Sequence, residues 1–152
     1  MTAFFCDSSA IVKRYIAETG SVWLMATTDP KNNPVYVARI TYVEVISAIT
    51  RREKGKHISA IDADNARLQF EQDYLNEFQK VEISENLIVE AANLVKKHAL
   101  RGYDAVQLAA ALETEMERLT VGLSSLTLLS ADMNLNAAAV SEGLTVDNPN
   151  NH

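Results

Sequence analysis

Four carboxylates stand where short apolar or helical segments could bring them together: Asp7, Glu44, Asp104 and Asp132. Asp7 directly follows the apolar run 3–6, and Asp132 comes shortly after the apolar run 126–129. Carboxylate oxygens are hard ligands that suit Mg²⁺ or Mn²⁺, and such ions often keep several of their waters. A cation held in this way can activate water and stabilise the leaving oxygen during phosphodiester hydrolysis. We therefore treat the four residues as candidate catalytic and metal-binding residues.

Each carboxylate also has a purely structural interpretation. Asp7 and Asp132 precede predicted helices and could serve only as N-caps, and Asp104 with Gln107 three positions later resembles a capping box. Glu44 is harder to explain in this way. It lies in the apolar stretch 42–46, where a carboxylate needs either an exposed helix face or a polar partner.

The segments that would position these residues alternate between strands and helices. Apolar or alternating runs predict strands at 3–6, 35–38, 80–83, 126–129 and 144–146. Helical spacing predicts helices at 10–16, 21–28, 41–54, 59–78, 87–98 and 104–117, with Gly102 as a break, and a short final helix. This alternation is typical of α/β proteins with a mostly parallel sheet covered on both faces, in which ligands bind beyond the carboxyl ends of the strands. We expect one domain, 1–147, and a disordered tail, 148–152.

Four sequence blocks, in this order, resemble the PIN domain, and in particular VapC-like toxins of type II toxin-antitoxin systems. The blocks are Phe5–Ser9, Thr41–Val45, Leu100–Ala109 and Leu129–Asp132. The resemblance extends from Ala3 to about Pro149, nearly the whole chain. It implies a three-layer α/β/α fold and a ribonuclease that uses Mg²⁺ or Mn²⁺ to hydrolyse the RNA backbone.

The resemblance assigns the acidic roles to the four carboxylates, and our hypothesis is that Asp7 and Asp104 hold the first ion while Glu44 and Asp132 complete the site. By the same resemblance, small hydroxyl residues support the carboxylates: Ser8, Ser9 and Ser130. It also implies a cognate antitoxin and self-pairing into a homodimer. One departure is the segment 133–135, where many relatives carry an aromatic or further acidic residue, and this weakens the case for a second metal ion.

Charge and composition narrow the remaining choices. A formal net charge of −6 argues against nonspecific coating of nucleic acid, although it permits a carboxylate-rich nuclease. No stretch approaches the about 20 apolar residues that cross a bilayer, so we expect a cytoplasmic protein without membrane contact. Basic residues that could contact RNA phosphates, or could simply favour helix ends, are Lys13, Arg14, Arg51, Arg52 and Arg101.

Other functions remain open at this stage. The main alternative is a catalytically degenerate PIN module that binds RNA or a protein partner without cleavage. A metal-carboxylate site could also act on DNA or on a nucleotide phosphomonoester. A phospho-receiver domain fits poorly, because no lysine follows a late strand. For partner contacts we expect exposed apolar surface around Ile16, Val22 and Leu24.

Overall fold

The computed structural model describes residues 2–152 and is built around a five-stranded sheet whose paired strands are all parallel. The strands are β1 (Ala3–Cys6), β2 (Val35–Ala38), β3 (Gln79–Val81), β4 (Leu126–Leu129) and β5 (Thr145–Asp147), in the order β3-β2-β1-β4-β5. Only Met1, at the start of the expected domain, lies outside the described residues. The predicted parallel α/β fold is confirmed.

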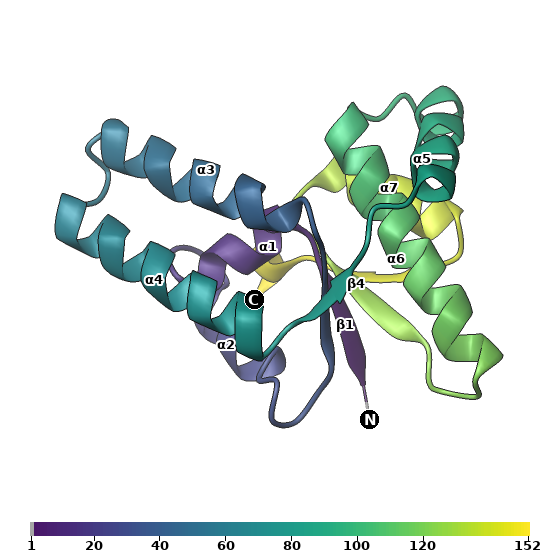
Figure 1. The fold of residues 1–152 in the computed structure, drawn as a ribbon, viewed down its shortest axis with the longest axis horizontal. Helices are drawn as coiled ribbons and strands as arrows, with labels where there is room; N and C mark the ends of the chain where they lie inside the picture. The colour runs from purple at the N-terminus through teal and green to yellow at the C-terminus, as the bar shows by residue number, and fades with distance from the viewer. Residues whose placement is uncertain (1) are drawn as a thin grey trace.

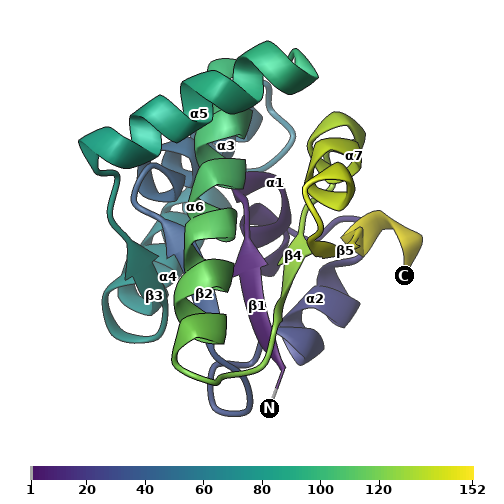
Figure 2. The ribbon, with the colours of Figure 1, turned by 90° about the vertical axis from the view of Figure 1, so that its right-hand side faces the viewer.

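Helices cover both faces of this sheet (Figures 1 and 2). They are α1 (Ser8–Ile11), η1 (Val12–Arg14), α2 (Ser21–Thr27), α3 (Thr41–Lys54), α4 (Ala60–Asn76), α5 (Glu85–His98), α6 (Gly102–Thr120), α7 (Met133–Ser141) and η2 (Pro149–Asn151). None of the helices in residues 2–152 combines the length and apolar character that crossing a membrane would need.

Two apolar cores lie on opposite faces of the sheet, because successive strand residues point to opposite sides. In β1, Ala3 and Phe5 pack with α5, α6 and α7, whereas Phe4 and Cys6 pack with the layer formed by α1 to α4. All four β1 residues are buried. A central strand buried on both faces explains why its sequence is a continuous apolar run.

The chain reverses its direction of sheet growth between β1 and β4. From β1 it proceeds outward through β2 to β3, and β4 then pairs with the other side of β1 before β5 joins the edge. Such a switch point leaves a crevice at the carboxyl ends of the two central strands. Asp7 follows β1 and Ser130 follows β4, so both residues lie at this crevice.

The turn between α5 and α6 differs from the prediction. Helix α5 ends at His98, and Ala99 adopts a left-handed backbone conformation with φ of 53°. Gly102 does not break a helix but is the first residue of α6. A residue in the left-handed region at the end of a helix reverses the chain, and here it is alanine rather than the usual glycine.

The C-terminal segment also differs from the predicted disordered tail. Residues 149–151 form η2, Pro149 is buried, and the ring of His152 stacks on Trp23 of α2 at a centroid distance of 3.8 Å. Gly20 allows this close approach, since a Cβ atom there would lie 2.1 Å from the Pro149 carbonyl oxygen. The stacking of His152 on Trp23 and the removal of apolar surface from water offset the loss of chain entropy in this segment.

The apolar surface predicted around α2 is only partly present. Val22 is 85% exposed, but Ile16 and Leu24 are buried in the core on the α1 to α4 side of the sheet. The prediction of partner contacts at Ile16 and Leu24 was therefore wrong. Both side chains are used to pack the short helices against β1 and β2.

Candidate active site

Asp7 is both a helix cap and the central carboxylate of the candidate site. Its Oδ1 accepts hydrogen bonds from the Ala10 backbone N–H, at 2.9 Å, and from Ser9 Oγ, at 2.7 Å. Its Oδ2 accepts one from Ser130 Oγ at 2.6 Å. Burial raises the pKa of Asp7 to about 6 despite these donors, and the nearby charge of Asp104 contributes to the rise. A raised pKa from burial and like charge is typical of functional sites.

Glu44 projects from the first turns of α3 toward the same crevice. Gln107 Nε2, from α6, donates hydrogen bonds to Glu44 Oε1 at 2.7 Å and to Thr41 Oγ1 at 2.9 Å. Burial raises the pKa of Glu44, and the charges of Asp7 and Asp104 raise it further. These mutual effects indicate that three of the four predicted carboxylates share one neighbourhood.

Gln107 has a role that the sequence did not reveal. The capping-box interpretation was wrong, because α6 begins at Gly102 with Arg101 at its N-cap and Asp104 lies inside the first turn. Gln107 is buried and points across to α3 instead of back along its own helix. A buried amide within an otherwise apolar helix face was the available signal, since such a group requires a polar partner.

Asp104 and Asp132 are joined through Arg101. Arg101 Nε donates to Asp104 Oδ2 at 3.0 Å, and its Nη2 donates to Asp132 Oδ2 at 3.2 Å. The other Asp132 oxygen, Oδ1, accepts the Leu135 N–H at 2.9 Å and caps α7. The capping role predicted for Asp132 therefore coexists with a position beside the other carboxylates.

The predicted serines fasten the ends of β1 and β4 together. Ser130 Oγ donates to Asp7 and accepts the Asp132 N–H at 3.0 Å, while Ser9 Oγ donates to Asp7 and accepts the Ala131 N–H at 2.9 Å. Ser8 contributes a hydrogen bond that lowers the pKa of Glu44. The hydroxyl groups thus fix the carboxylates relative to the sheet.

A cleft of about 540 Å³ opens beside these carboxylates, and we call it the site cleft. Its lining includes Glu44, the serines Ser8 and Ser9, and the predicted basic residues Lys13, Arg51 and Arg52. Glu18, which the sequence did not point to, pairs there with Lys13 Nζ at 3.2 Å and with Arg52 Nη2 at 3.1 Å. Basic side chains and two carboxylates, Glu18 and Glu44, therefore line the same cleft.

Arg14 does not reach this cleft. Its Nη1 donates to the carbonyl oxygen and the hydroxyl of Thr28, each at 2.9 Å, and its guanidinium carbon lies 5.8 Å from the centre of the Phe78 ring. These contacts hold its guanidinium against α2 and the end of α4. Among the predicted basic residues, Arg14 is thus used in packing.

The donor chemistry of the site suits a hard divalent cation. Four carboxylates provide oxygen ligands and three hydroxyl groups support them, and a bound cation would relieve the repulsion between the crowded negative charges. Within residues 2–152, no three His, Cys, Asp or Glu side chains are already close enough to enclose one ion. A cation that keeps several waters fits such an open arrangement, because water can bridge the longer gaps.

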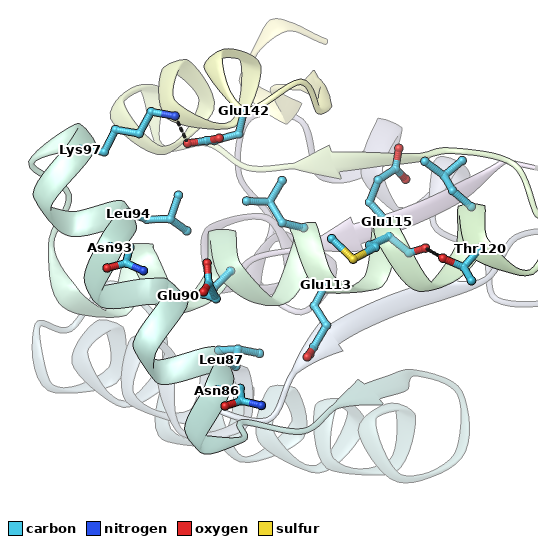
Figure 3. Close-up of a pocket in the computed structure, with 14 residues that line it drawn as sticks. Asn86, Leu87, Glu90, Asn93, Leu94, Lys97, Glu113, Glu115, Thr120 and Glu142 are labelled. Carbon is cyan, nitrogen blue, oxygen red and sulfur yellow. Dashed lines mark hydrogen bonds and ion pairs between the residues drawn. The ribbon is translucent and has the colours of Figure 1, made fainter.

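A larger hollow than the site cleft lies elsewhere. A groove of about 910 Å³ runs between α5 and α6, and we call it the α5–α6 groove (Figure 3). Leu87, Leu94 and Met116 line it, with glutamates including Glu90 and Glu113. It contains none of the predicted site residues.

The chain belongs to the PIN domain family, which matches residues 4–139. Two proteins of Mycobacterium tuberculosis, Ribonuclease VapC45 and Ribonuclease VapC49, are each 30% identical to it over 146 residues, covering 96% of this chain and 95% of each relative. A solved toxin-antitoxin complex from Klebsiella pneumoniae contains a similar fold, with a TM-score of 0.60, 19% identity and coverage of 98% of both chains. The family resemblance predicted from the four sequence blocks is confirmed.

Proposed function

We infer that this protein is a divalent-metal-dependent endoribonuclease and the toxin component of a VapBC-type toxin-antitoxin pair. The observation that carries this proposal is the convergence of four carboxylates at the β1/β4 switch point of a PIN domain. PIN-domain ribonucleases generally depend on divalent metals, and the two mycobacterial relatives are ribonucleases by name.

In this proposal Asp7 and Asp104 hold Mg²⁺ or Mn²⁺, and Glu44 and Asp132 complete the site. When bound, the ion supplies Lewis acidity and a more acidic water. Gln107 keeps Glu44 directed at the site through its hydrogen bond. The hydroxyls of Ser9 and Ser130 hold Asp7 in place and leave little freedom for the carboxylate to move.

The same cleft provides the means of holding RNA. Arg51 and Arg52 line it beside Glu44, and guanidinium groups there can neutralise backbone phosphates on either side of the scissile bond. Lys13 also lines the cleft, but its side chain is buried and pairs with Glu18. The exposed ring of Tyr103 lies on the rim, where it can stack on an unpaired base. The cleft thus supplies both backbone contacts and a surface for one base.

We further propose a cytoplasmic protein that forms a homodimer and is inhibited by a cognate antitoxin. The Klebsiella complex, a toxin bound to its antitoxin, supports a partner of this kind by analogy of fold. Exposed apolar side chains on α5 and α6, such as Ile88 and Met116, offer surface for contacts between protein chains. Sedimentation of the purified chain, alone and with a co-expressed antitoxin, tests both assemblies.

The deciding experiment is cleavage of a mixed RNA pool with Mg²⁺, Mn²⁺ or EDTA. The parent should cut only with metal, and Asp104→Asn should lose cutting while keeping its circular dichroism spectrum. Asp64→Asn is the matched control, because Asp64 is an exposed aspartate of α4 that pairs with Arg67. Equal cutting by Asp104→Asn would indicate a contaminant, and absence of cutting by the parent would favour a degenerate module that binds RNA or a partner.

A further inference from the structure

Arg101 occupies the position between two candidate ligands that come from different parts of the chain. Asp104 lies in the first turn of α6, and Asp132 precedes α7. One guanidinium contacts both, at 3.0 Å and 3.2 Å. The planar fork of arginine suits such a bridge, because its N–H groups point in fixed directions toward separate oxygens.

The oxygens that Arg101 contacts are also available as ligands for a cation. Asp132 Oδ1 is already used to cap α7, which leaves Oδ2 as the oxygen facing the site, and Oδ2 accepts the Arg101 hydrogen bond. On Asp104, Oδ2 accepts the other hydrogen bond from Arg101. An ion that binds both aspartates at these atoms therefore displaces the guanidinium.

Arg101 is able to leave without disturbing the core. Its side chain is 82% exposed, whereas those of Asp104 and Asp132 are 20% and 21% exposed. The two carboxylates are held in a partly enclosed edge while the guanidinium covers them from the solvent side. Exposed ion pairs of this kind are individually weak, so displacing the guanidinium from the two carboxylates costs little.

We propose that Arg101 is the internal counter-ion of the site, and that Arg101 and a divalent cation compete for Asp104 Oδ2 and Asp132 Oδ2. This inference rests on the proposed metal site and adds a regulated step to it. In the metal-free protein the single positive charge of Arg101 offsets part of the negative charge of the two aspartates. Metal entry releases its guanidinium near Asp104 and Asp132, where it becomes available to a phosphate.

Calorimetric titration of the RNA-free protein with Mn²⁺ tests the competition directly. Arg101→Ala removes the competitor, so its Kd for Mn²⁺ should fall about three- to tenfold, a size set by the weakness of exposed ion pairs. Arg101→Lys keeps the charge but cannot bridge two carboxylates with one planar group, so its Kd should fall about twofold. Unchanged or weaker Mn²⁺ binding by Arg101→Ala would overturn the proposal.

Arg67→Ala is the matched control for net charge. Arg67 also bridges two carboxylates, Asp64 at 2.7 Å and Glu53 at 2.9 Å, but it touches none of the candidate ligands. Its Kd for Mn²⁺ should match that of the parent. An equal fall in Kd in both alanine variants would show that the loss of one positive charge anywhere on the protein explains the effect, and this would overturn the proposal. If the parent itself bound no Mn²⁺, the proposed metal site would fail, which distinguishes that failure from the failure of the competition alone.

Discussion

Glu142 in the α5–α6 groove and the carboxylates Asp7 and Glu44 at the candidate site have opposite surroundings. In the groove, Lys97 and His98 lie beside Glu142 and lower its pKa, as surface partners do for an ordinary carboxylate. At the cleft, burial raises the pKa of Asp7 and Glu44 although neutral donors surround them. The first arrangement satisfies charge within the protein. The second leaves negative charge unsatisfied at a fixed place, which is the condition for binding a cation.

The largest expected effect comes from a matched pair of glutamates. Burial raises the pKa of both Glu44 in the cleft and Glu113 in the groove, but Glu44 lies near Asp7 and Asp104 whereas Glu113 lies near Glu117. Glu44→Gln should reduce RNA cleavage about 100-fold or more, because it removes a proposed ligand, whereas Glu113→Gln should change it less than about twofold. Initial rates at saturating Mg²⁺ measure both, and similar losses in the two variants would contradict the assignment of the cleft.

A smaller loss is expected when the support of Glu44 is removed. Gln107→Ala leaves the glutamate without its donor and should slow cleavage about tenfold, since residues that orient ligands typically matter by 10- to 100-fold. Thr41→Val removes the other acceptor of the same amide but leaves the Glu44 contact possible, so its rate should fall less. The order of the two rates is the informative result, and a larger loss in Thr41→Val would show that Gln107 acts by packing α3 against α6.

Some features of the candidate site could be predicted from the sequence, and others could not. The proximity of Asp7, Glu44, Asp104 and Asp132 could be predicted because parallel strands end at one edge and because each carboxylate lies in a block that resembles the family. Their catalytic and metal-binding roles stay predictions. The role of Gln107 depends on how α3 and α6 approach each other, which local spacing does not determine. Local spacing also does not reveal the contacts of Glu18 and Arg101. Each of these residues pairs with a side chain from a distant segment, Arg52 for Glu18 and Asp132 for Arg101.

The C-terminal segment illustrates the same limit in the fold. Asn148–His152 is polar and short, so its composition predicted disorder. Its contacts are with Gly20 and Trp23, more than a hundred residues earlier in the chain. Helix α3 was the opposite case, because its apolar spacing and the glycine at its end gave the bounds Thr41–Lys54 from the sequence alone.

Asp7→Asn should stabilise the metal-free protein while destroying the site. Asp7 is 3% exposed, and its pKa rises from 3.8 to about 6. At pH 7.5 the folded state therefore carries a buried negative charge that is solvated less well than in the unfolded chain. Two units of pKa correspond to roughly 3 kcal/mol, and imperfect hydrogen bonding by asparagine reduces the gain to about 1–3 kcal/mol. Urea unfolding in EDTA at pH 7.5 measures this difference.

The stabilisation expected from Asp7→Asn should depend on pH. Because the folded pKa of Asp7 is raised, the folded state binds more protons between pH 3.8 and about 6, and the parent loses stability as the pH rises through this window. Asp7→Asn lacks that loss, so its advantage should be full above pH 6 and shrink toward pH 4. A variant less stable than the parent at every pH would show that the charge of Asp7 is better satisfied than its burial indicates.

The smallest effect is expected when an exposed apolar side chain of the α5–α6 groove is replaced by a polar one. Met116 is 70% exposed on α6, and Met116→Gln keeps the length and helix propensity of the side chain. The free energy of unfolding should stay within about 0.5 kcal/mol and the cleavage rate should match the parent, as for other exposed substitutions. If sedimentation shows the parent to be a dimer and the variant a monomer, the groove contributes to the interface between chains. A fall in cleavage without a change in assembly would mean instead that the groove and the cleft are coupled through α6, whose first turn carries Asp104 and whose later turns line the groove.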